Sequence, residues 1–225
     1  TGKAIEEYLD KNELKEKRKV NNMTEMINIH NWLLPKSEKH MQKMLDKAVK
    51  KFGVPEYQKE VRDRALALVR KKRVALDIGA HIGFWSKSLS EQFNYVMAFE
   101  PVESFRDCWR ENIDKNNIDL FPNALGEKEQ TVEMVVNMNN TGNTHIDPNS
   151  LGKGTVRMIT LDSLELSEVD FIKIDVEGFE IYVLKGAKET LLRTKPIIVI
   201  EQKSHDFYGN NQYIAKDYLC DKVYN

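Results

Sequence analysis

The chain has 225 residues, of which 41% are hydrophobic and 31% charged, and its formal net charge is −1. That length accommodates one α/β domain with an extension, and no apolar run reaches the roughly 20 residues that a membrane span requires. Cys108 and Cys220 lie outside any spacing typical of a disulfide framework or a zinc site. We therefore expect a cytoplasmic protein in a reducing compartment, with no membrane association and no zinc site, and we assign no metal-binding residue. A divalent ion held by paired acids stays open as an alternative.

The two parts of the chain differ in charge. Residues 1–75 contain 19 Lys and Arg against 11 Asp and Glu, whereas the remainder contains 15 against 24. A basic front part is compatible with an anionic partner such as nucleic acid. Its charges alternate in sign and lack interleaved aromatic residues, which favours a solvated helical surface instead.

Residues 1–56 form a charged, helical N-terminal extension or cap in this interpretation. Residues 1–25 have few apolar positions and predict a solvated helix. The aromatic segment 31–35 is turn-like, and Ser37 is a plausible N-cap for a helix that ends before Gly53 and Pro55. A further amphipathic helix over about 57–71 leads into the domain that we assign to residues 57–225.

The most informative stretch is 74–84, an apolar strand that runs into a glycine turn and then into a helix predicted over 84–93. Gly79 and Gly83 permit a sharp turn and close approach of a ligand to the backbone. Their spacing departs from the dinucleotide fingerprint G-x-G-x-x-G, and Asp77 in the turn would repel a pyrophosphate but suit a cation. A second apolar strand, 95–99, ends at Glu100, which is placed to accept both hydroxyls of a ribose.

The rest of the chain alternates strands with helices, which indicates a mostly parallel sheet covered on both faces. An insert rich in Asn, Gly, Thr and Pro, at about 139–154, interrupts the pattern and predicts a mobile loop. The predicted helices cover 104–115 and 178–192, and the predicted strands cover about 120–125, 131–138, 156–161, 171–175 and 196–201.

Ordered blocks over about 57–203 make the sequence similar to the FkbM-type family of S-adenosylmethionine-dependent O-methyltransferases. The resemblance rests on the segments Leu76–Gly83, Phe99–Pro101, Ala124–Gly126, Thr160–Leu164, Phe171–Glu180, Leu184–Ala187 and Pro196–Glu201. It implies an α/β, Rossmann-like class I methyltransferase fold and methyl transfer to a hydroxyl of a sugar, a glycan or another small metabolite. The long charged front and the short segment after Glu201 depart from the family pattern.

The cofactor implied by the resemblance is S-adenosyl-L-methionine, with S-adenosyl-L-homocysteine as product. The expected cofactor-binding residues lie at the ends of the predicted strands and in the glycine turn. They are Asp77, Gly79, Ala80, His81, Gly83, Phe84, Glu100, Pro101, Asn123, Ala124, Leu125 and Asp175.

Transfer to a hydroxyl needs a group that takes or stabilises its proton, and the candidates lie at the carboxyl ends of the last two strands. Asp175 with Lys203 resembles the acid and lysine of 2′-O-ribose methyltransferases, with Glu201 tuning the lysine. His205 is the alternative base because its ordinary pKa lies near neutrality. Asp175 and Glu177 are also interpretable as caps of the helix that follows Gly178, and Lys203 and His205 as surface residues.

Four residues are candidates for contact with the acceptor: Trp32, His40, His145 and Glu177. Trp32 is equally interpretable as packing between extension and core. We expect the polar insert, which carries His145, to close over the acceptor.

Two other functions remain open on the sequence alone. The basic front and the Asp175–Lys203 pairing fit an RNA 2′-O-ribose methyltransferase, although nucleic acid is the less favoured partner. A non-catalytic cofactor-binding module, with the cap mediating assembly such as a homodimer, is the third.

Overall fold

The computed structural model of the protein describes residues 25–201, 218, 219 and 223. Its centre is a five-stranded sheet in the order β12-β11-β3-β4-β5, in which every neighbouring pair is parallel. The strands are β3 (Val74–Ile78), β4 (Tyr95–Phe99), β5 (Ile118–Phe121), β11 (Val169–Ile174) and β12 (Ile197–Ile200). The predicted α/β, Rossmann-like fold is confirmed.

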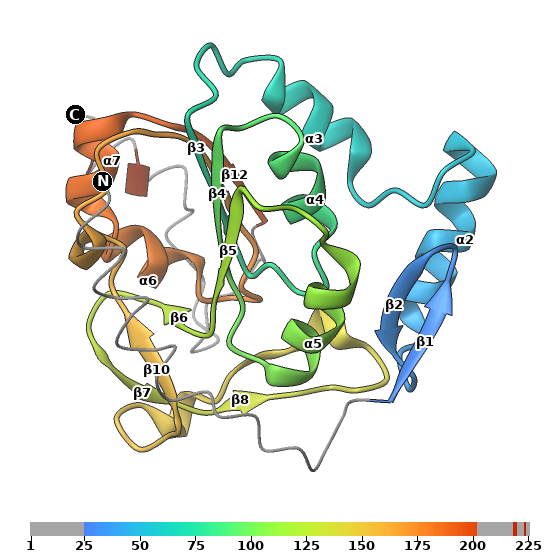
Figure 1. Ribbon diagram of the computed structural model, residues 1–225. Helices are drawn as coiled ribbons and strands as arrows, with labels where there is room; N and C mark the ends of the chain where they lie inside the picture. The colour runs from blue at the N-terminus through green and yellow to red at the C-terminus, as the bar shows by residue number, and fades with distance from the viewer. Residues whose placement is uncertain (1–24, 202–217, 220–222, 224–225) are drawn as a thin grey trace.

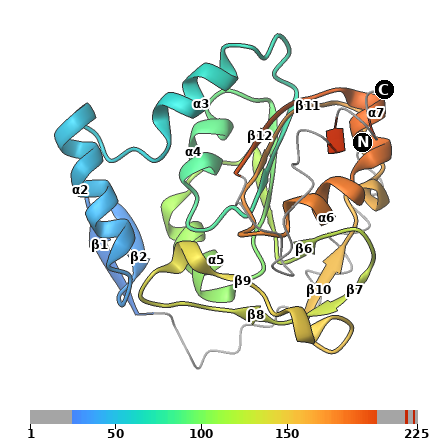
Figure 2. The ribbon, with the colours of Figure 1, turned by 180° about the vertical axis from the view of Figure 1, so that it is seen from behind.

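Helices cover both faces of this sheet (Figures 1 and 2). One face carries α3 (Lys59–Leu66), α4 (Phe84–Ser90) and α5 (Glu103–Asn112), and the other carries α6 (Glu180–Lys185) and α7 (Lys188–Thr194). Successive side chains of β3 point to opposite faces of the sheet. Leu76 and Ile78 enter the core beneath α6 and α7, and Ala75 enters the core beneath α4. Full burial of each such Leu or Ile contributes roughly 1.5–3 kcal/mol.

Two of the predicted helices differ in extent. The helix expected over 57–71 is confined to α3, and the one expected over 178–192 is divided into α6 and α7. The division follows from long-range contacts of Asp162. The Gly186 carbonyl accepts the backbone N–H of Asp162, and the Asp162 carboxylate accepts the N–H groups of Glu189 and Thr190 at the start of α7. Asp162 begins the short 3-10 helix η3 (Asp162–Leu164).

The described part of the extension is not wholly helical, which corrects the sequence interpretation. A hairpin of β1 (Met26–Ile29) and β2 (Trp32–Pro35) precedes α2 (His40–Phe52). Of the segment 31–35, interpreted as a turn, residues 32–35 are a strand. The turn is His30–Asn31, both at positive φ as in a tight two-residue hairpin. Residues 1–24 lie outside the described range.

The extension lies against α4 and α5 (Figure 1) and buries an apolar cluster there. The cluster comprises Trp32, Leu34, Met41, Leu45, Ile82, Phe84 and Cys108. Ser37 does not cap α2: its hydroxyl donates to the Met138 carbonyl, and the Glu38 carboxylate accepts the backbone N–H of Met41 instead. The interpretation of Trp32 as packing between extension and core matches this arrangement.

A smaller sheet follows β5 and lies below the main one in Figure 1. It contains β6 (Ala124–Leu125), β7 (Gln130–Val132) and β10 (Val156–Ile159), and the strand predicted over 131–138 is divided into β7 and β8 (Met134–Val135). The polar insert contains η1 (Thr141–Asn143), β9 (His145–Ile146), which pairs with β8, and η2 (Pro148–Ser150). Among the described residues, no helix has the length and apolarity needed to cross a bilayer.

Candidate functional site

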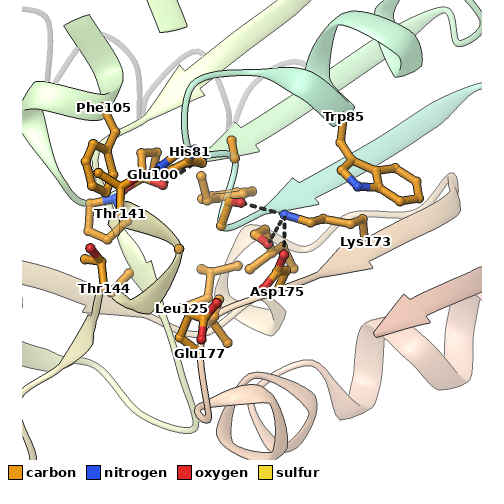
Figure 3. Close-up of a pocket in the computed structure, with 18 of the residues that line it drawn as sticks. His81, Trp85, Glu100, Phe105, Leu125, Thr141, Thr144, Lys173, Asp175 and Glu177 are labelled. Atoms are coloured by element: carbon orange, nitrogen blue, oxygen red, sulfur yellow. Dashed lines mark hydrogen bonds and ion pairs between the residues drawn. The ribbon is translucent and has the colours of Figure 1, made fainter. Parts of the chain in front are cut away.

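A cleft of about 880 Å³, including the part open to solvent, lies at the carboxyl ends of β3, β4 and β11. Figure 3 shows His81, Glu100, Phe105 and Thr141 at one end of it, and Lys173 with Asp175 at the other. This is the edge at which open α/β sheets place their ligands. The walls come from the main sheet, from the extension and from the polar insert.

The glycine turn after β3 forms one wall of the cleft. Gly79 adopts φ +75°, and a Cβ there would lie 1.9 Å from the backbone oxygen of Asp175, so the position requires glycine on two grounds. Gly83 does not line the cleft: a Cβ on it would meet the side chains of Ile113 and Trp109 at about 3 Å, so helix packing requires it. Phe84, the next residue, does line the cleft.

Glu100 lies at the end of β4 and is 5% exposed. One carboxylate oxygen accepts the backbone N–H of His81 at 2.8 Å, and the other accepts that of Val102 at 2.9 Å. Burial raises the pKa of Glu100 to about 7, and these two hydrogen bonds offset only part of that rise. The carboxyl group is thereby held in a fixed orientation at the cleft wall.

The sequence interpretation missed Lys173, whose ammonium group lies beneath the glycine turn. It donates to the backbone oxygen of Gly79 at 2.6 Å and lies 3.3 Å from the Asp77 carboxylate and 3.9 Å from that of Asp175. Strand register explains the pairing of Lys173 with Asp77, because the two residues are partners on adjacent parallel strands. Burial alone would lower the pKa of Lys173, but Asp77 and Asp175 more than compensate and raise it.

Asp77 belongs to this buried network and is not among the residues that line the cleft. Its carboxylate accepts the Ser86 hydroxyl at 2.6 Å, and Ser86 in turn accepts the Trp109 indole N–H. The expected direct contact of Asp77 with a cofactor has no support in this geometry. Its role is to balance Lys173 and to join β3 to α4.

Three carboxylates converge at the ends of β11 and β12. One oxygen from each of Asp175, Glu177 and Glu201 lies within 4.8 Å of the other two, a grouping that either shares protons or holds a divalent cation. Burial and then the Asp175 charge raise the pKa of Glu201 to about 7. Burial, followed by the same acids, raises the pKa of Tyr57, which lines the cleft.

The remaining predicted residues divide into three groups. Those that line the cleft are Gly79, Ala80, His81, Phe84, Glu100, Pro101, Asn123, Ala124, Leu125, Asp175 and Glu177. Trp32 is buried against Phe84, His40 is exposed, and His145 bonds to the Asn143 carbonyl, so none of these three lines the cleft. Lys203 and His205 lie outside the described residues.

Several lining residues had no place in the sequence interpretation: Met41, Tyr57, Phe105, Met134, Thr141, Thr144, Ile146, Lys173 and Val176. One of them carried a signal in the sequence, since Lys173 is a charged residue between Ile172 and Ile174 in a predicted buried strand. Half of the others, Met41, Thr141, Thr144 and Ile146, come from the extension and the insert, whose packing against the turn no local pattern reveals.

Comparison with known proteins identifies the family. The model of the methyltransferase FkbM domain matches residues 77–224, which is more than half of the chain. The chain belongs to the FkbM methyltransferase family. The resemblance found in the sequence is confirmed.

Individual relatives are more distant. Hexuronic acid methyltransferase AglP of Haloferax volcanii is 30% identical over 132 residues, which cover 56% of this chain and 54% of AglP. The chain thus spans about half the length of that curated relative. A crystal structure of methyltransferase FkbM from Methylobacillus flagellatus is 24% identical with a TM-score of 0.40, over 60% of this chain and 34% of the other. A putative type II methyltransferase from Anaeromyxobacter dehalogenans is 16% identical with a TM-score of 0.37, over 64% and 46%.

Proposed function

We propose that this FkbM-family protein transfers a methyl group from S-adenosyl-L-methionine to a hydroxyl of a sugar, a glycan or another small metabolite. One observation carries the proposal: a fixed acid, Glu100, and two carboxylates, Asp175 and Glu177, line the same cleft beside a glycine turn, and Glu201 lies next to this pair. The first suits the ribose of a nucleoside donor, and the second suits the proton of an acceptor.

The chemistry of the cleft fits a cationic methyl donor. Glu100 retains acceptor capacity on both oxygens for ribose hydroxyls, beyond the two backbone hydrogen bonds that orient it. The carboxylate of Asp175 lies on the opposite wall and favours positive charge nearby. The apolar side chains of Phe105, Leu125 and Ile146 provide dry surface for a flat ring. The bound donor supplies the activated methyl group.

The chain's own contribution to the reaction is alignment and proton acceptance. Alignment of two bound reactants is worth up to roughly 7–11 kcal/mol in well-oriented cases. We assign proton acceptance from the acceptor hydroxyl to Asp175, which lines the cleft, together with its neighbour Glu201. The pKa of Glu201 is raised to about 7, which is matched to a neutral operating pH. The ammonium group of Lys173 contacts both the Asp175 carboxylate and the Gly79 carbonyl, so it holds the proposed base beside the glycine turn.

The acceptor class has support from two directions. AglP is named for methylation of a hexuronic acid, which is a sugar derivative. The carboxylates of Asp175 and Glu177 in the cleft, with Glu201 beside them, would repel the phosphates of RNA, so the electrostatics oppose an RNA ribose methyltransferase. The sugar or small-metabolite acceptor is therefore the better supported.

The test is methyl transfer to a panel of sugars and nucleosides, followed by mass spectrometry. We expect Glu201→Gln and Asp175→Asn to lower turnover by roughly 10²-fold or more, the usual contribution of a general base, while S-adenosyl-L-homocysteine still binds. Equal turnover by the parent and both variants would refute the assignment of the base. Turnover on RNA alone, with a steep loss of affinity as salt rises, would refute the acceptor class.

A further inference from the structure

Three segments that are far apart in the sequence meet in one hydrogen-bond chain at the wall of the cleft. Glu38 comes from the extension, His81 from the glycine turn and Thr141 from the polar insert. Glu38 is 1% exposed and Thr141 2% exposed. Figure 3 shows Thr141 beside His81 and Phe105 on one side of the cavity.

The hydrogen bonds that link Glu38, Thr141 and His81 run in one direction. One oxygen of Glu38 accepts the backbone N–H of Thr141 at 2.6 Å and its hydroxyl at 2.5 Å, and the other oxygen accepts the N–H of Met41. An ionised carboxylate only accepts, so the Thr141 hydroxyl proton points to Glu38. The hydroxyl oxygen is 2.8 Å from Nε2 of His81 and is left to accept from it.

The His81 ring is held and uncharged. Its edge-on contact with Phe105 places the two ring centroids 4.6 Å apart. Burial lowers the pKa of His81 to about 4, so at neutral pH the ring carries one proton. That proton is on Nε2 if Thr141 accepts, which leaves Nδ1 as an acceptor on a residue that lines the cleft.

We propose that Glu38 and Thr141 are positioning residues for the donor site, which hold His81 in the Nε2–H tautomer so that Nδ1 accepts a hydrogen bond from the amino group or a hydroxyl of the bound donor. The extension and the polar insert are then parts of the donor site. The ligand half of this inference rests on the proposed function, whereas the tautomer half does not.

The tautomer is measured directly by ¹⁵N NMR of histidine-labelled protein without ligand, with the His81 signals assigned by their absence in His81→Asn. We expect a protonated Nε2 and an unprotonated Nδ1 in the parent and in Thr141→Ser. Thr141→Val, which removes the hydroxyl at nearly constant shape, should give a mixture of tautomers. A parent with its proton on Nδ1, or an unchanged Nε2–H ratio in Thr141→Val, would overturn the proposal.

Binding of S-adenosyl-L-homocysteine, followed by calorimetry, tests the ligand half. We expect Thr141→Val and Glu38→Gln to weaken binding roughly tenfold, the usual effect of one lost hydrogen bond in a buried site, and Thr141→Ser to restore it. Thr155→Val is the matched control, since Thr155 is exposed just after the insert and this variant should bind like the parent. If Thr141→Val has a mixture of His81 tautomers but binds S-adenosyl-L-homocysteine as tightly as the parent, the proposed contact of Nδ1 with the donor is refuted. No binding by the parent would refute the proposed donor and leave the NMR result to decide the tautomer.

Discussion

Replacement of Lys173 by Met should unfold the protein much more readily, because it removes one partner of a buried ion pair at similar side-chain length. Asp77 is fully buried, and without Lys173 its carboxylate retains the Ser86 hydroxyl as its described partner. The Gly79 carbonyl also loses a donor at 2.6 Å. Removal of one partner of a buried pair typically costs about 3–5 kcal/mol, which is a large part of the 5–15 kcal/mol that stabilises an ordinary domain.

The assay is urea denaturation at pH 7, followed by circular dichroism, on a double-mutant cycle. Lys173→Met combined with Asp77→Asn should recover most of the lost free energy, since it leaves no uncompensated buried charge and Asn still accepts from Ser86. Lys51→Met is the control, because Lys51 pairs with Glu60 on the surface and its loss should change stability little. A Lys173→Met variant within about 1 kcal/mol of the parent would refute the reasoning, as would a double variant no more stable than the single one.

Two further predictions concern the site. Turnover at saturating donor and acceptor should rise as the pH increases through about 7, because Glu201 accepts a proton only when ionised and its pKa is raised to about that value. Glu201→Gln should abolish the rise. A flat profile of the parent from pH 5 to 8 would contradict this prediction. Gly79→Ala should lower both stability and donor affinity. Gly152 has nearly the same φ but open space around it, so Gly152→Ala should show only the roughly 1–2 kcal/mol of backbone strain. Equal losses of thermal stability in the two variants would count against the collision with Asp175.

The sequence predicted the architecture well where patterns are local. Continuous apolar runs identified β3, β4, β11 and β12, whereas the strand predicted over about 120–125 is divided between the end of β5 and β6. Glu100, predicted at the end of a strand, lines the cleft, but Gly83 does not. The hairpin at 26–35 escaped because its turn, His30–Asn31, lacks the Asn-Gly or Asp-Gly sequence that usually marks it. The division of α6 from α7 escaped because its cause, Asp162, lies more than 20 residues away.

The candidate site was predicted only in part, because some of its residues come together through contacts between distant segments. Gly79, Glu100 and Asp175 line the cleft together, since parallel strands bring their carboxyl ends to one edge, whereas Asp77 and Glu201 do not line it. The lysine was sought at Lys203, which lies outside the described residues, whereas Lys173 is buried with Asp77 through strand register. Thr141 and Glu38 joined the site through tertiary packing, which no periodicity within either segment reveals.

The central claim is that this cleft binds S-adenosyl-L-methionine with its ribose held by Glu100. Calorimetry of the purified chain with the donor and with S-adenosyl-L-homocysteine tests it most directly. We predict that both bind the parent and that Glu100→Ala weakens them by roughly 10–100-fold, the effect of lost hydrogen bonds to a charged group, while Glu103→Ala at the exposed start of α5 changes nothing. Absence of binding to the parent, or equal affinity in Glu100→Ala, would contradict the account.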